Sequence, residues 1–278
     1  LRLPRVLLAF LVGSILATAG CAYQGAFRNP LADPYLLGVS AGAGLGATLI
    51  IVHASTARNF YLPVAAFGGA LAAVSITYLL GRSAISGRSS TALILAGVAV
   101  ASVLTAAQTL VQQQNTDVLR EVYTWILGRL STSGWGELLV ITPYILICSV
   151  VLLRYRRVLD VFSVGDEEAQ TMGLPVARAR GAIIVAASLG TAAAVSFTGL
   201  IGFVGIIVPH ILRLVVGSSY RILLPLSVIY GGIFLVLADI LARTLLAPQE
   251  IPIGVVTALL GAPFFLFVLG SRRSGSIT

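Results

Sequence analysis

The stretch "RNPLADPYLLGVSAGAG" (Arg28–Gly44) interrupts an apolar part of the chain with a charged residue, an amide, two prolines and an acid. Pro30 and Pro34 restrict the backbone angle φ and cannot continue a helix interior. The stretch therefore predicts a stiff turn between two helices. Its polar residues would be presented on that turn.

Three glycines recur at every fourth position from the second half of this stretch onward, namely Gly38, Gly42 and Gly46. Small residues with this spacing lie on one helix face and let a neighbouring helix approach closely. We therefore interpret them as packing residues with no contact to a substrate.

The composition around this turn is that of a membrane protein. Of 278 residues, 58% are hydrophobic and 10% are charged, whereas soluble domains carry about 25% charged residues. Apolar runs of about 20 residues, the length that crosses a bilayer as a helix, recur along the chain. We predict an all-α polytopic protein with one transmembrane domain (residues 1–278) and about nine spans: Val6–Phe27, Pro34–Val52, Phe60–Gly81, Ser89–Gln113, Glu137–Leu153, Ala179–Phe197, Leu200–Val216, Ile222–Leu246 and Ile251–Gly270.

One uncharged run, Gly181–Leu212, is too long for a single crossing and short for two. The sequence Ser-Phe-Thr-Gly at residues 196–199 favours a break into two shortened helices.

The net charge of +8 comes from arginine alone. The arginines lie at the ends of apolar runs, which indicates membrane topology rather than nucleic-acid binding. About two thirds of them would share one face, which the positive-inside bias makes cytoplasmic: Arg28, Arg82, Arg88, Arg154, Arg156, Arg157, Arg178, Arg180, Arg213, Arg221, Arg272 and Arg273. Leu1 would then lie outside and Thr278 inside.

Two connecting segments are expected to be structured. Residues 112–135 are mildly amphipathic, which predicts a short interfacial helix with Trp125 and Trp135 near the headgroups. The longest cytoplasmic segment, residues 154–180, contains "GDEEAQTMGLP", a short helix with acids in its first turn, where the helix dipole favours them. This helix either lies on the membrane surface or docks a cytosolic partner.

Asp239 is an acid within a span, which is costly unless it is paired. Arg243 lies four residues further on, on the same helix face, and is the simplest partner. A proton relay is the alternative, and no other residue supports it. His210 is interpreted as a packing residue rather than a ligand, and no metal site is predicted.

Three stretches together carry a family resemblance: "LRLPRVLLAFLVGSILATAGCAYQGAFRNPLADPYLLGVSAGAG" (Leu1–Gly44), "GLIGFVGIIVPHILRLVVG" (Gly199–Gly217) and "LADILARTLLAPQEIPIGVVTALLGAPFFLFVL" (Leu237–Leu269). With "GDEEAQTMGLP" they resemble the permease subunits of bacterial ABC importers for iron–siderophores, haem and cobalamin, the FecCD/BtuC type. That family has ten spans, so the resemblance implies that the first helix is missing here.

The resemblance implies a non-catalytic transport subunit in the bacterial plasma (inner) membrane. Its partners would be a second copy of itself or a close homologue, two cytosolic ABC ATPase subunits and a soluble or lipid-anchored substrate-binding protein. No cofactor would be bound by this subunit, because ATP and magnesium belong to the ATPase. No nucleic acid would be involved.

The resemblance also implies roles for individual residues. Arg2, Arg5 and Arg243 match arginines that receive glutamates of the binding protein, a task that suits the planar guanidinium fork; ordinary placement at a helix end is the alternative. A cytoplasmic gate would comprise Asn29, Leu31, Ser90 and Thr91, although the last two could simply cap a helix. ATPase coupling, within about residues 160–178, would involve Glu167, Glu168, Ala169, Met172, Gly173 and Leu174.

Two other classes of function were weighed against an importer permease. An ion-coupled secondary transporter would need polar residues at mid-span, and a membrane-embedded enzyme would need a catalytic constellation; the sequence supports neither well. Ferric siderophore is the first choice of cargo on the breadth of the family, with haem and cobalamin as alternatives that no residue separates.

Overall fold

The computed structural model describes residues 2–54, 58–83, 90–130 and 134–274, and within these ranges the chain forms helices and no strand. The predicted all-α architecture is therefore confirmed, whereas the count of about nine transmembrane spans stays a prediction. In chain order the helices are α1 (Arg2–Phe27), α2 (Val39–His53), α3 (Arg58–Ser83), α4 (Ser90–Gln114), the 3-10 turn η1 (Thr116–Val118), α5 (Leu119–Ile126), α6 (Trp135–Arg154), α7 (Arg156–Phe162), α8 (Asp166–Thr171), α9 (Val176–Thr198), α10 (Val204–Val216), α11 (Tyr220–Thr244) and α12 (Ile253–Ser274).

Each of the nine predicted spans coincides with one of these helices. Within the described residues, α1, α3, α4, α6, α9 and α11 are long and apolar enough to cross a membrane. The other three predicted spans correspond to shorter apolar helices, Val39–His53, Val204–Val216 and Ile253–Phe264. The predicted start of the fourth span, Ser89, lies outside the described residues.

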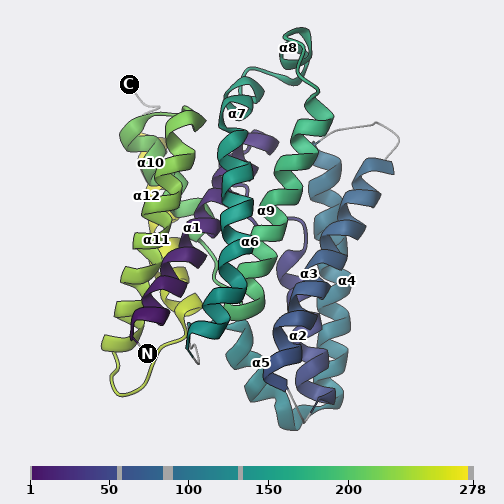
Figure 1. The fold of residues 1–278 in the computed structure, drawn as a ribbon, viewed down its shortest axis with the longest axis vertical. Coiled ribbons are helices and arrows are strands. Elements are labelled where there is room, and N and C mark those ends of the chain that lie inside the picture. The colour runs from purple at the N-terminus through teal and green to yellow at the C-terminus, as the bar shows by residue number, and fades with distance from the viewer. Residues whose placement is uncertain (1, 55–57, 84–89, 131–133, 275–278) are drawn as a thin grey trace.

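Helix α1 lies at the centre of the molecule (Figure 1). It packs against α11, α9, α10 and α6, while α2, α3 and α4 form a second group that joins the first through contacts of α3 with α9. Close packing along α1 depends on small residues: a Cβ added at Gly13 would lie 2.2 Å from the carbonyl oxygen of Gly231 on α11. Helix α1 is the most buried of the six long apolar helices, and its small residues leave room for the neighbouring backbones.

The glycine pattern of α2 is confirmed as a packing face for two of its three members. A Cβ at Gly42 would lie 2.2 Å from the carbonyl oxygen of Gly69 on α3, and one at Gly46 equally close to that of Ala65. Gly38 was wrongly included, because it precedes the helix and adopts a left-handed conformation with φ 81°. The predicted span Pro34–Val52 therefore started five residues too early, because helix α2 begins at Val39.

The uncharged run at residues 181–212 breaks at the predicted place. Helix α9 ends at Thr198, and α10 begins at Val204 after an extended linker. Only α10 is short, with 13 residues against 23 in α9. The prediction of two shortened helices is therefore correct for α10 and wrong for α9.

The two ends of the bundle carry different elements (Figure 1). The chain start, η1, α5 and the α11–α12 connection lie at one end, which we call the α5 end. Helices α7 and α8 lie at the other, the α8 end. Two pairs of arginines separate in the same way. Arg5 and Arg243 both pair with Asp239 at the α5 end, and Arg28 and Arg180 both pair with Asp166 at the α8 end.

Two connecting segments differ from expectation. Residues 156–162, for which no helix was predicted within the cytoplasmic segment, form α7, whose Leu159 and Phe162 are fully buried. The predicted interfacial helix is α5, but Trp125 is buried against the core and only Trp135 is exposed. Burial by the protein, and not the headgroup region, therefore accounts for Trp125.

Candidate gate, coupling and docking sites

The turn at residues 28–38 is built by local hydrogen bonds. The side-chain oxygen of Asn29 accepts a hydrogen bond from the backbone N–H of Leu31 at 3.0 Å, and the carboxylate of Asp33 accepts one from the N–H of Tyr35 at 2.8 Å. Such bonds from a side chain to the backbone two residues on stabilise tight turns. The turn holds Asn29 half-buried and leaves Leu31 55% exposed.

The turn is also attached to the linker between α9 and α10. The hydroxyl of Tyr35 donates to the carbonyl oxygen of Ile201 at 3.0 Å and accepts from the N–H of the same residue at 3.0 Å. Backbone groups without helical partners are costly at membrane depth unless the protein satisfies them. One hydroxyl thus satisfies both backbone groups of a residue where the chain is not helical.

The second half of the predicted gate lies at the start of α4. Ser90 is the first residue of that helix, and Thr91 is exposed. The side chain of Ser90, like the residues before it, lies outside the described part of the chain. The gate assignment of these two residues stays a prediction.

The predicted coupling helix is present as α8, with Asp166, Glu167 and Glu168 in its first turn. It ends at Gly173, where φ is 80°, and the N–H of Leu174 donates to the carbonyl of Ala169 at 3.1 Å. This is the Schellman arrangement that closes a helix with glycine. The predicted helix and its glycine stop are confirmed.

The apolar residues of this segment point in different directions. Ala169 is fully buried and Leu174 packs against the hydrophobic core, whereas Met172 is 63% exposed. Glu167 and Glu168 are exposed as well. A partner at this end would therefore contact Met172 and the two glutamates, while Ala169 and Leu174 attach the segment to the bundle.

Arg180 holds α8 in position, a role that the sequence analysis missed. Its guanidinium donates to both carboxylate oxygens of Asp166, at 2.9 and 2.7 Å, and to the carbonyl of Ala26 at the end of α1, at 3.0 Å. It also lies 5.2 Å from the ring centroid of Phe162 on α7. One buried cation thus joins α1, α7, α8 and α9.

Asp166 connects this assembly to the predicted gate turn. Arg28, the residue before Asn29, lies 3.8 Å from its carboxylate. The hydrogen bonds from Arg180, aided by the charges of Arg180 and Arg28, lower the pKa of Asp166 against a smaller opposing effect of burial. A groove of about 420 Å³, lined in part by Asp166, Gly173 and Leu174, separates α8 from the start of α9.

Asp160 performs a similar task for α11. Its carboxylate accepts hydrogen bonds from the backbone N–H of Tyr220 and from the hydroxyl of Ser219, the latter at 3.0 Å. An acid at a helix N-terminus satisfies unpaired N–H groups there. The sequence offered no signal for this contact, because Asp160 lies about 60 residues before the helix that it caps.

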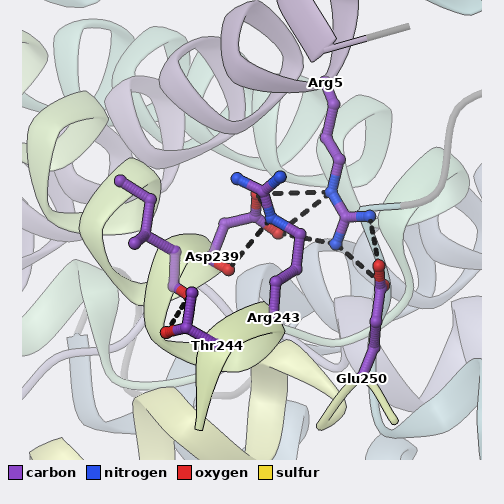
Figure 2. A network of polar contacts seen from close by, with 6 residues as sticks. Arg5, Asp239, Arg243, Thr244 and Glu250 are labelled. Carbon is purple, nitrogen blue, oxygen red and sulfur yellow. Dashed lines mark hydrogen bonds and ion pairs between the residues drawn. The ribbon is translucent and has the colours of Figure 1, made fainter. Parts of the chain in front are cut away.

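At the α5 end the predicted docking arginines form part of a charged network (Figure 2). Arg5 pairs with Asp239 at 2.8 Å and with Glu250 at 3.0 Å, and Arg243 pairs with Asp239 at 3.1 Å. The expected Asp239–Arg243 pair is therefore confirmed. The contacts of Arg5 were not foreseen, because Arg5 is more than 230 residues from either acid.

The three predicted docking arginines differ in their exposure. Arg2 is exposed at the start of α1, the side chain of Arg243 is 30% exposed, and that of Arg5 is 17% exposed. Within the described residues, Arg243 donates a hydrogen bond through Nε to the carbonyl oxygen of Asp239, and its terminal nitrogens donate none. Its ion pair with the carboxylate of Asp239 is also made through Nε, at 3.1 Å. Whether these residues receive a partner stays a prediction.

His210 packs inside the bundle, as expected. It is 6% exposed, and its ring meets that of Phe264 edge-on with centroids 5.7 Å apart.

Comparison with known proteins gives consistent matches over nearly the whole chain. Residues 1–271 match the model of the FecCD transport family. The chain is 44% identical over 274 residues to the cobalamin import system permease protein BtuC of Halobacterium salinarum, covering 98% of this chain and 73% of that protein. It is 41% identical over 284 residues to the hemin transport system permease protein HmuU of Yersinia pestis, covering 98% and 83%.

A solved structure described as an inward-facing conformation of a metal-chelate type ABC transporter matches with a TM-score of 0.90 and 33% identity. The match covers 98% of this chain and 86% of that one. The arrangement of helices is thus the same as in that transporter over almost the full length compared.

Proposed function

The chain belongs to the FecCD transport family and is an ABC importer permease, and from this premise we propose that it forms one half of a dimeric membrane path for a metal chelate. The observation that carries this proposal is the family match over residues 1–271 together with a shared fold. The chain spans a membrane several times. We place it in the bacterial plasma membrane with the α8 end in the cytoplasm, because most arginines lie toward that end.

We propose that two cytosolic ATPase subunits, which would bind ATP and magnesium, drive the permease through α8. A lever needs a contact surface and a rigid attachment. Exposed Met172 and the two glutamates supply the surface, while Arg180 attaches α8 to α1 and α9. Because Arg28 and Arg180 share Asp166, a displacement of α8 would act directly on the turn that presents Asn29 and Leu31. That turn, with Ser90 and Thr91, is the proposed gate.

At the opposite end, we propose that a substrate-binding protein docks through carboxylates that reach Arg2, Arg5 and Arg243. The terminal fork of Arg243 is available, and Arg2 is exposed. A bidentate arginine–carboxylate pair gives both energy and orientation. The second half of the path would be a second copy or a close homologue of this chain.

Our first candidate for the cargo is a ferric siderophore, with haem and cobalamin next. The comparisons support a metal chelate as the class of cargo. The matched structure is described as a metal-chelate transporter, and the two relatives are named for cobalamin and hemin. Fluorescence quenching of the binding protein by each chelate in turn would decide among them. Tight binding of a corrinoid or of haem, and of no siderophore, would replace our first choice.

The alternative of an ion-coupled transporter loses its main candidate residue. Asp239 is 1% exposed and is neutralised by Arg5 and Arg243. A buried carboxylate that already pairs with two arginines is a structural group and not an open ion site. No other observation favours that function.

The proposed lever is tested by Met172→Arg. This change adds bulk and charge to the exposed surface of α8 without touching Asp166 or Arg180, so we expect the ATPase subunits to co-purify at least tenfold less efficiently. Tyr123→Arg is the matched control, because Tyr123 is 57% exposed at the α5 end. Unchanged co-purification of Met172→Arg, with a normal unfolding temperature, would show that α8 is not the interface.

A further inference from the structure

The network at the α5 end contains one carboxylate that a docking site does not need. Two arginines and two acids are present, so their formal charges cancel. Asp239 alone contacts both Arg5 and Arg243, whereas Glu250 contacts only Arg5 (Figure 2). Asp239 therefore joins the two arginines, whereas Glu250 neutralises Arg5 alone.

The two acids also differ in how deeply their side chains are buried. The side chain of Asp239 is 2% exposed and that of Glu250 is 55% exposed. A buried carboxylate cannot leave its arginines without a large desolvation cost. An exposed one exchanges a protein partner for water at little cost. Asp239 is the fixed member of the network, and Glu250 is the exchangeable one.

Glu250 occupies the part of Arg5 that would bind an incoming carboxylate. Nε and Nη2 of Arg5 donate to Asp239 at 3.1 and 2.8 Å, while Nη1 and Nη2 donate to the two oxygens of Glu250, both at 3.0 Å. The bonds to Glu250 form the end-on bidentate arrangement of an arginine–carboxylate pair. Another carboxylate can take this position only if Glu250 leaves.

The backbone around Glu250 is fixed, so only its side chain has to move. The N–H of Gln249 donates to the carbonyl of Leu246 at 3.0 Å, and that of Ile251 donates to the carbonyl of Ala242 at 2.9 Å. Arg5 also lowers the pKa of Glu250 by hydrogen bonding to it, so this carboxyl is charged at neutral pH. A rotation about the side-chain bonds would carry that charge into water.

We propose that Glu250 is a built-in competitor for the docking site, a carboxylate that closes the fork of Arg5 until a carboxylate of the binding protein replaces it. This inference rests on the proposed docking function. The exchange keeps the network neutral in both states and keeps Nη1 and Nη2 of Arg5 paired when the partner departs. It also weakens docking, which favours release of an emptied binding protein.

The experiment measures the affinity of the permease, in lipid nanodiscs, for the purified substrate-binding protein encoded beside it. Removing the competitor should tighten the complex, by about two- to fivefold for Glu250→Gln and at least as much for Glu250→Ala, the range that an exposed ion pair permits. Asp117→Asn is the matched control: it removes one exposed carboxylate from η1 at the same end, outside the network. It should change the affinity less than twofold.

Two further variants separate the failure of this inference from that of the proposed docking function. Arg2→Glu and Arg243→Glu should each weaken the complex at least tenfold. If they do so but neither Glu250 variant binds more tightly, the competitor role is wrong and docking stands. If neither arginine variant weakens binding, docking at this end is wrong, and the competitor role is wrong with it.

Discussion

At the scale of single residues, a few polar side chains hold together segments that are far apart in sequence. Arg180, Asp160 and Tyr35 each satisfy backbone groups or charges on another element. Such contacts matter more in a membrane protein than on a soluble surface, because water cannot replace the lost partner. Each of them can be removed by a change of one or a few atoms.

Tyr35→Phe removes only the hydroxyl that bridges the N–H and carbonyl of Ile201. We expect a loss of about 2 kcal/mol in the free energy of unfolding, because two backbone groups lose their partner. Thermal unfolding in detergent measures this loss. Tyr230→Phe is the control, since Tyr230 is 49% exposed on α11, and equal stability of the two variants would contradict the bridging role.

The lowered pKa of Asp166 predicts that the α8 end loses stability at acid pH. This carboxyl has a lower pKa in the folded protein than in the unfolded chain, so its pairing with Arg180 stabilises α8 above the ordinary carboxyl pKa of about 4. That stabilisation is lost as the pH falls through the lowered pKa. Limited digestion with pepsin from about pH 5 to about pH 2.5 should therefore release fragments cut near α8 only at the acid end.

Asp166→Asn should abolish that dependence. It removes the charge at every pH, so α8 should be cut at a similar relative rate throughout the range. A wild-type protein whose cleavage near α8 does not rise toward acid pH would contradict the assigned role of the ion pair.

At the scale of elements, the spacing between helices is set by backbone contact rather than by side-chain volume. Helices α2 and α3 touch at Gly42 and Gly69, where each glycine's missing Cβ would lie 2.2 Å from the other's carbonyl oxygen. Van der Waals packing of this kind drives helix association in lipid, where the hydrophobic effect contributes little. The two helices therefore tolerate no added atom at this point.

Gly42→Ala should separate α2 from α3 and lower the free energy of unfolding by about 1–3 kcal/mol, the cost of overpacking a tight interior. Gly68→Ala is a matched control on α3, because a Cβ there would meet nothing within 4 Å. We expect that variant to be as stable as the wild type or slightly more so. The measurement is the unfolding temperature of each variant, and a Gly42→Ala protein as stable as Gly68→Ala would contradict the contact.

At the scale of the whole molecule, the two charged assemblies lie at opposite ends of one bundle, and α1 runs between them (Figure 1). Arg5 lies near the start of α1, and Ala26, which binds Arg180, lies near its end. A permease driven from one end and loaded at the other needs a rigid connection of this kind. Our proposal therefore places energy input and cargo delivery at the two ends of the same helix.

Transport itself supplies the test at this scale. Proteoliposomes that contain this chain with its ATPase subunits and binding protein should accumulate cargo only with ATP and magnesium. Vesicles that contain the chain alone should show no uphill uptake when a proton or sodium gradient is applied. Accumulation powered by such a gradient would favour the ion-coupled alternative and end the importer proposal for this chain.

The sequence by itself determined that the chain is an all-α membrane protein and where nine of its helices approximately lie. It also determined the stiff turn at Pro30 and Pro34 and the acidic helix that is stopped by Gly173. These features follow from composition, from apolar runs and from residues whose backbone preferences act locally. The same local rules gave Arg243 as a partner of Asp239, because the two are one helical turn apart.

Only the tertiary structure decided which residues meet across long stretches of chain. Arg5 with Glu250, Arg180 with Ala26 and Tyr35 with Ile201 are pairs without any periodic signal. It also decided that Trp125 and Ala169 face inward, since their side chains are compatible with either environment. The physical reason is that local sequence sets helix propensity and hydrophobic length, whereas contacts at a distance depend on how closely small residues let the helices pack.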